Sequence, residues 1–104
     1  MSASASLDEQ IRSHLETLEA APGDAQAFEA LEDLYEKASR WEDLVALYEG
    51  RARAVPPGAP LLARAASLAH AKLRNVARAE DLYRQLLQSE PSNAGALRSL
   101  AALL

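Results

Sequence analysis

Apolar residues recur every three to four positions along most of this chain, which is the spacing of one face of an α-helix. Residues 7–20 show the pattern with Leu7, Ile11, Leu15 and Leu18. Five further segments repeat it, separated by short runs that contain proline, glycine or small polar residues. The pattern therefore predicts six helices, at about residues 7–20, 25–38, 41–54, 60–73, 76–89 and 94–104.

The segments between these helices carry recognisable start and stop residues. Asp24 is a residue type that caps helix starts, either Ser92 or Asn93 can cap the last helix, and Pro60 suits a first helical turn. The links are short, so consecutive helices are predicted to be antiparallel neighbours. Gly50 lies inside a predicted helix, where we expect a close backbone approach. Residues 1–6 have no large apolar side chain to bury beyond Met1 and are predicted to be disordered.

A longer period is superimposed on the helical one. Residues 21–35 reappear in degenerate form at residues 90–104, and Pro22, Pro57 and Pro91 follow each other at steps of 35 and 34 residues. A fixed period of this size is typical of helical arrays, in which each unit buries its apolar face against its neighbours. The chain is therefore predicted to be all-α.

These units resemble the tetratricopeptide repeat (TPR) family, whose unit is a pair of helices. The first and last copies carry a proline, then Asp24 or Asn93 two residues later, and then an alanine. Aromatic and leucine positions of the family fall on Phe28, Leu31, Tyr35, Trp41 and Tyr48, which with Leu44 form the expected core. The resemblance implies a right-handed superhelical array of antiparallel helix pairs, an α-solenoid. Its expected parts are a half-repeat at 7–21, repeats at 22–56 and 57–90, and a half-repeat at 91–104.

The phasing of the repeats suggests how this chain relates to a larger protein. It opens on a helix of the second type and stops on an apolar helix of the first type. We therefore expect the N-terminal fragment of a longer repeat protein. Arginine outnumbers lysine nine to two, which favours a bacterial source. The leucines of the last helix are expected to mediate self-association, or else the helix end frays; those singled out are Leu100, Leu103 and Leu104.

The resemblance also implies protein–protein recognition, because first helices of successive repeats line a concave groove that accepts a peptide or a partner helix. On this chain the expected groove residues are Gln26, Glu29, Asp33, Glu36, Arg64, Leu68, Lys72 and Arg98. The acidic side chains of the first repeat would repel a peptide carboxylate. A partner with basic residues over the first repeat and acidic residues over the second suits the groove better.

Charge is distributed unevenly between the two halves of the chain. Residues 1–50 contain twelve acidic and three basic residues, and residues 51–104 contain three acidic and eight basic residues. This polarity leaves a second interpretation open, a scaffold module that oligomerises through repeat ends and opposite charges. A third is a structural end section of a long array. The net charge of −4 and the scarcity of aromatic residues disfavour nucleic acid as a partner.

Catalytic and metal chemistry find little support in the sequence. The two histidines, His14 and His70, lie far apart on different predicted helices, and the chain has no cysteine. His70 occupies a core aromatic position of the repeat and is expected to be packed. We therefore predict no enzyme activity, no cofactor and no metal.

No apolar run is long enough to span a bilayer and no secretory signal is evident, so a cytoplasmic location without membrane insertion is expected.

Overall fold

The computed structural model describes residues 3–104, with side chains from Ser6 onward. These residues form six α-helices and no strand, which confirms the predicted all-α class. The helices are α1 (Ala3–Ala20), α2 (Ala25–Lys37), α3 (Trp41–Ala54), α4 (Ala59–Ala71), α5 (Val76–Ser89) and α6 (Ala94–Leu103). Helix α1 begins at Ala3, four residues before Leu7, and the predicted disorder of residues 1–6 stays a prediction. Residues 1–2 lie outside the described residues.

Polar side chains fix the starts of α2, α5 and α6. Asp24 Oδ1 accepts a hydrogen bond from the Ala27 N–H at 2.9 Å, and Asn93 Oδ1 accepts one from the Ala96 N–H at 2.9 Å. Asn75 caps α5 in the same way, although its sequence position was not singled out. Each cap of this kind stabilises its helix by about 1 kcal/mol. The predicted cap at Asp24 is confirmed, and of the two candidates for α6 the structure shows Asn93 as the cap.

The end of α2 is a tight turn built around Ser39. This residue has a φ of 55°, in the left-handed region. Its N–H donates to the Glu36 carbonyl at 3.1 Å, and the Arg40 N–H donates to the Tyr35 carbonyl at 2.9 Å. These paired bonds satisfy carbonyls that the helix end would leave free, and they reverse the chain direction before α3 begins.

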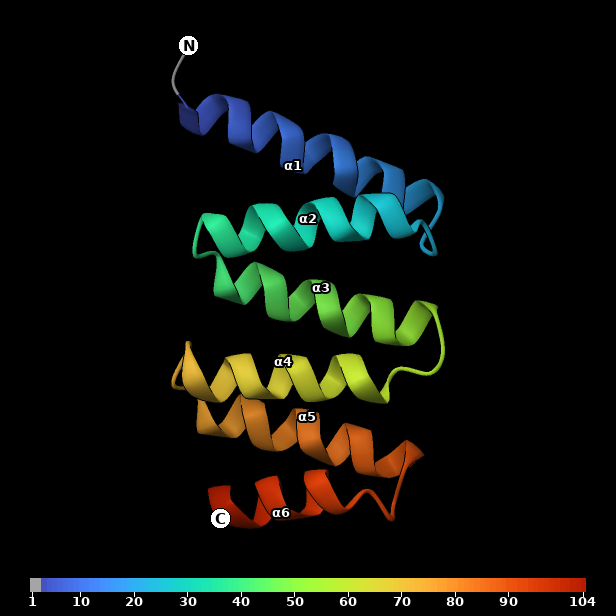
Figure 1. Cartoon of the computed structure of the whole chain (residues 1–104), viewed down its shortest axis with the longest axis vertical. Helices are drawn as coiled ribbons and strands as arrows, with labels where there is room; N and C mark the ends of the chain where they lie inside the picture. Colours follow the sequence, from blue (N-terminus) through green and yellow to red (C-terminus); the bar gives the residue numbers. More distant parts are fainter. Residues whose placement is uncertain (1–2) are drawn as a thin grey trace.

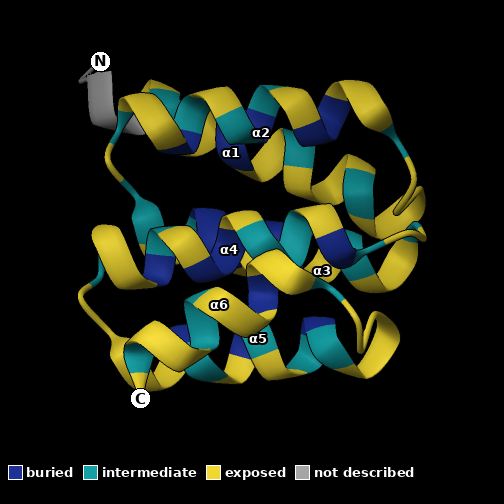
Figure 2. Cartoon of the chain, turned by 60° about the horizontal axis from the view of Figure 1, so that its bottom comes forward, coloured by how far each residue is buried: buried dark blue, intermediate teal, exposed yellow. Residues whose placement is uncertain are grey.

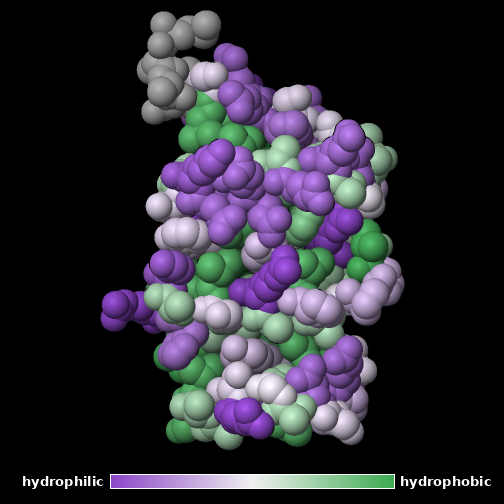
Figure 3. All heavy atoms as spheres, viewed as in Figure 1, coloured by the Kyte–Doolittle hydropathy of each residue, from purple (hydrophilic) through white to green (hydrophobic). Residues whose placement is uncertain are grey.

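Each helix packs against the helices before and after it in the chain, so the six form a stack of antiparallel neighbours (Figure 1). The stack measures 48 × 27 × 15 Å along its principal axes. When the molecule is turned by 60°, α2, α4 and α6 lie to one side of α1, α3 and α5 (Figure 2). We call the side that carries α2, α4 and α6 the even face. Hydrophilic side chains gather over α1 and α2, and more hydrophobic surface lies toward α5 and α6 (Figure 3).

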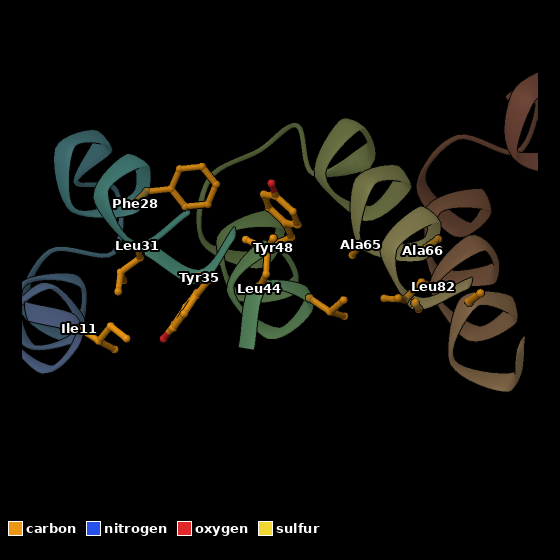
Figure 4. Close-up of a cluster of buried hydrophobic side chains, with 12 residues drawn as sticks. Ile11, Phe28, Leu31, Tyr35, Leu44, Tyr48, Ala65, Ala66 and Leu82 are labelled. Carbon is orange, nitrogen blue, oxygen red and sulfur yellow. The ribbon is translucent and has the colours of Figure 1, made fainter. Parts of the chain in front are cut away.

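The apolar core runs through the stack as a continuous strip (Figure 4). In the first half it is built from large side chains of α2 and α3, including Leu31, Tyr35 and Leu44, with Ile11 added from α1. Burying a leucine contributes about 1.5–3 kcal/mol, so the burial of large apolar side chains stabilises this half. In α4 the core residues are Ala65, Ala66 and Ala69, all 0% exposed. Such small side chains let helices approach closely, and α4 packs tightly against both α3 and α5.

Five of the six predicted core residues are buried, and the exception is Trp41. Trp41 begins α3 and is only partly buried against the core. The ammonium of Lys72, at the end of α4, lies 5.2 Å from the centre of its ring. The indole is therefore covered on one side by a cation rather than by apolar side chains, because it stands at the edge of the stack.

One charged side chain is buried between alternate helices. Glu49 of α3 is 8% exposed and forms an ion pair with Arg78 of α5. Arg53, one turn further along α3, lies 3.6 Å from the same carboxylate. A buried carboxylate requires such partners, because losing one leaves a charge without solvation. Glu49 thus ties α3 to α5 across the alanine-rich α4.

Candidate protein-binding surfaces

The side chains predicted to line a groove all come from the even-numbered helices or their ends. Gln26, Glu29, Asp33 and Glu36 of α2 are exposed, as are Arg64, Lys72 and Arg98 of the second half. Leu68 is partly buried and packs against the core. The exposure of the polar members is the arrangement a binding face needs. Their binding of a partner stays a prediction.

Three helices meet at Glu32, a residue that the groove prediction left out. The Tyr48 hydroxyl of α3 donates a hydrogen bond to Glu32 Oε2 at 2.5 Å. Arg64 Nη1 of α4 lies 3.6 Å from the same oxygen. Burial, and then this hydrogen bond, raise the pKa of Tyr48 well above its ordinary value of 10.0. Glu32 therefore joins α2, α3 and α4 from the even side, and it engages one of the predicted groove cations.

Other predicted groove charges also have partners within the chain. Lys37 Nζ pairs with Asp33 Oδ2 at 2.9 Å across one turn of α2, and Lys72 lies over Trp41. The cations of both pairs are exposed, so each pair stabilises the fold by only about 1 kcal/mol or less. Glu29, Glu36 and Arg98 make no ion pair with any described residue. The even face thus has an acidic region on α2 and separate cations on α4 and α6.

A concave surface lies between α1 and α3, on the side opposite the even face. It is a groove of about 460 Å³ with a mostly apolar lining, and we call it the α1–α3 groove. Its floor is Phe28 and Tyr35 of α2, and the α1 wall carries Leu15, which is 42% exposed. The remaining lining comes from the link after α1 and from both walls: Leu18, Glu19, Pro22, Asp43, Ala46, Leu47, Gly50, Arg51 and Ala54. The sequence analysis did not predict this surface.

Gly50 widens the α1–α3 groove because it has no side chain. A Cβ atom built on Gly50 would have nothing within 4 Å, so the predicted close backbone approach at this glycine is wrong. The close approach occurs instead at Gly58, where an added Cβ would lie 2.5 Å from the Ala52 carbonyl oxygen. Gly50 faces open space because α1 and α3 both pack on α2, which leaves a gap between them.

The last helix leaves part of its apolar surface uncovered. Leu103 packs against the main core and Leu100 is partly buried. Leu97 is 49% exposed and Leu104 is 78% exposed. The leucines of this helix are therefore divided, with one edge buried against the preceding helices and the other edge in solvent. Self-association through this helix stays a prediction.

The histidines do not form a site in the described residues. His70 is exposed rather than packed, so the expected core position is wrong; the small side chains of α4 fill the core next to it. Within residues 3–104, no group of three or more potential metal ligands is close enough to hold an ion.

None of the described helices is both long and apolar enough to cross a membrane. Neither the models of known protein families nor the curated proteins yield a match to this chain.

Proposed function

We propose that this chain is a non-enzymatic protein–protein interaction module that binds a partner segment along its even face. The resemblance to TPR units supports this reading, because the even-numbered helices correspond to the first helices of those repeats. On that reading the stack is part of a right-handed solenoid. The observation that carries the proposal is the separation of exposed charge on this face. Glu29 and Glu36 stand on α2, whereas Arg64 and Arg98 stand on α4 and α6.

This separation defines the chemistry of the partner. An extended peptide or helix that crosses the even face meets carboxylates at one end and guanidinium groups at the other. Complementary charges speed association and fix the orientation of the partner. The proposed partner therefore carries a basic block and an acidic block in succession. A peptide with only acidic residues and a free terminal carboxylate is not expected to bind, because α2 repels it.

Calorimetry with synthetic peptides tests the proposal. Two peptides with a lysine block joined to a glutamate block, in either order, are compared with an alternating peptide of identical composition. One block peptide is expected to bind with a dissociation constant on the order of 10⁻⁵ M, and the alternating peptide far more weakly. Equal binding of all three peptides, or none of either block peptide, would exclude the even face as a charge-reading surface.

Matched variants locate the binding surface. Glu29→Lys with Glu36→Lys reverses two charges on α2 and is expected to abolish binding of the block peptide. Glu9→Lys with Glu16→Lys makes the same change on exposed positions of α1 and is expected to leave most of the affinity intact. Equal losses in both double variants would indicate an effect of net charge rather than of the even face.

A second candidate function is self-assembly, in which copies of the chain associate through the last helix. The exposure of Leu97 and Leu104 supports it, because exposed leucines that lie together usually find a covering partner. Light scattering at increasing protein concentration and at several salt concentrations tests this candidate. Association that weakens as salt rises is expected if the opposite charges of the two halves contribute.

A further inference from the structure

We propose that the α1–α3 groove receives helix α6 of a second copy, so that copies join head to tail. This inference rests on the second candidate function, self-assembly, and is independent of peptide binding on the even face. Two different surfaces meet in the proposed contact. One is the apolar groove on the odd-numbered side, and the other is the uncovered edge of the last helix.

The groove has the dimensions and the lining of a helix-binding site. Its α3 wall runs from Asp43 to Ala54, which is about 17 Å at 1.5 Å per residue. Helix α6 contains 10 residues and is therefore about 15 Å long. Leu15 of the α1 wall, which is 42% exposed, offers apolar surface, and Gly50 leaves room for a side chain of the incoming helix. A helix seated by its apolar edge is a common mode of recognition.

The exposed edge of α6 matches this lining. Leu97, Ala101 and Leu104 follow each other at steps of four and three residues, so they form one ridge, and all three are exposed. Arg98 is the single charged residue within α6. Seating the ridge in the groove removes the exposed leucines of α6 and Leu15 of the groove wall from water together. That shared burial is the driving force of the proposed contact.

Charge selects this pairing over symmetric alternatives. The groove lining carries Glu19, Asp43 and Arg51. Asp43 is paired with Arg40 and Arg51 lies over the Phe28 ring, whereas Glu19 has no ion-pair partner among the described residues. The proposed docking of α6 brings Arg98 to Glu19. Two α6 helices facing each other would instead bring two Arg98 side chains together, and two groove ends would juxtapose the acidic halves. Like charges disfavour both arrangements.

A contact between two different surfaces has a consequence for assembly. Each added copy leaves one free groove and one free α6, so the product is an open chain whose mass grows with protein concentration. A single helix in a groove is a small interface, at the low end of specific contacts, so the association is weak. We expect a dissociation constant on the order of 10⁻⁴ M.

Two variants block the two surfaces separately. Gly50→Leu places a side chain in the open space of the groove, where the fold tolerates it because an added Cβ meets nothing within 4 Å. Leu97→Glu places a charge on the exposed ridge of α6. Sedimentation equilibrium is expected to show at least about tenfold weaker association for each variant alone. Gly50→Ala is the matched control; it fills little of the groove and is expected to associate like the wild type.

Mixing the two variants is the decisive measurement. The Gly50→Leu chain keeps an intact α6, and the Leu97→Glu chain keeps an intact groove. An equimolar mixture is therefore expected to form one-to-one dimers with the wild-type contact and to stop there. Circular dichroism of each variant checks that the helices are retained, and Leu104→Glu serves as a second ridge variant if Leu97→Glu loses helix content.

Three other outcomes would refute the groove assignment, the self-assembly or both. Association that Leu97→Glu abolishes and Gly50→Leu leaves unchanged would show self-assembly through α6 at a different surface, and would refute the groove assignment alone. Two impaired variants that do not complement each other when mixed would also refute it. A wild-type chain that stays monomeric at millimolar concentration would refute both the groove assignment and the self-assembly on which it rests.

Discussion

Tyr48 combines a packing role with a polar one. Its ring lies 6.0 Å from that of Phe28, and its hydroxyl donates to the partly buried carboxylate of Glu32. Because burial and this bond raise its pKa in the folded state, the folded chain holds the phenolic proton more tightly than the unfolded chain does. The resulting stabilisation is complete below about pH 10 and is lost as the pH rises through the folded-state pKa.

We therefore expect the free energy of unfolding in urea to be level approaching pH 10 and to fall above it. In Tyr48→Phe the fall should be shallower, and the loss at neutral pH should be about 1–2 kcal/mol for the missing hydrogen bond. Tyr35, whose pKa burial also raises, supplies the slope that remains. Identical slopes for the variant and the wild type above pH 10 would contradict the assignment to Tyr48.

Gly50, inside α3, and Gly58, at the start of α4, are expected to respond in opposite ways to alanine. Gly50→Ala should stabilise the fold by about 0.5–1 kcal/mol, because it improves helix propensity and the new methyl meets open space. Gly58→Ala should destabilise it, because the new Cβ would overlap the Ala52 carbonyl. Thermal melts of the two variants beside the wild type give the signs, and equal signs would show that the space around one glycine is misassigned.

At the scale of single elements, the turn after α2 holds a residue in an unfavourable backbone region. Ser39 adopts a φ of 55°, which glycine adopts without a steric penalty. We expect Ser39→Gly to raise the free energy of unfolding by about 0.5–1 kcal/mol, measured by urea denaturation. Ser13→Gly, at an exposed position inside α1, is the contrasting control and should destabilise. Destabilisation by Ser39→Gly would argue against the left-handed turn.

Helix boundaries were predictable because their causes are local. Asp24 and Asn93 cap helices through atoms three residues away, so the sequence alone indicates where α2 and α6 begin. The core of α2 and α3 followed from helical spacing for the same reason. Trp41 and His70 are less buried than the sequence predicts. Their burial depends on where the side edge of the helical stack lies. That edge is set by packing between helices, which periodicity does not encode.

The even face and the α1–α3 groove also differ in how far the sequence predicts them. Exposure of Glu29 and Glu36 could be predicted, because both lie opposite the apolar stripe of α2. The α1–α3 groove could not, since it arises from a gap between two helices that pack on a third. A signal was nevertheless present in the sequence. Ala46, Gly50 and Ala54 are small residues at steps of four along α3, away from its buried positions.

For the whole molecule, nearest-neighbour packing predicts uneven stability along the stack. Helices α2 to α5 each have neighbours on two sides, whereas α1 and α6 each have one. Hydrogen exchange followed by mass spectrometry should therefore show the slowest exchange in α3 and α4 and the fastest in α1 and α6. Exchange is best measured at low protein concentration, where the proposed association is negligible. Equal protection in all six helices would indicate that the stack opens as a single cooperative unit.

The order of packing has a consequence for how the chain folds during synthesis. Every helix finds its main partners in the segments immediately before and after it, and α3 reaches no further than α5 through Glu49 and Arg78. Contacts that are so local in sequence close only short loops, which favours rapid folding. As the ribosome releases each helix, its preceding partner is already present. The chain can thus add one layer at a time, without any segment waiting for a distant partner.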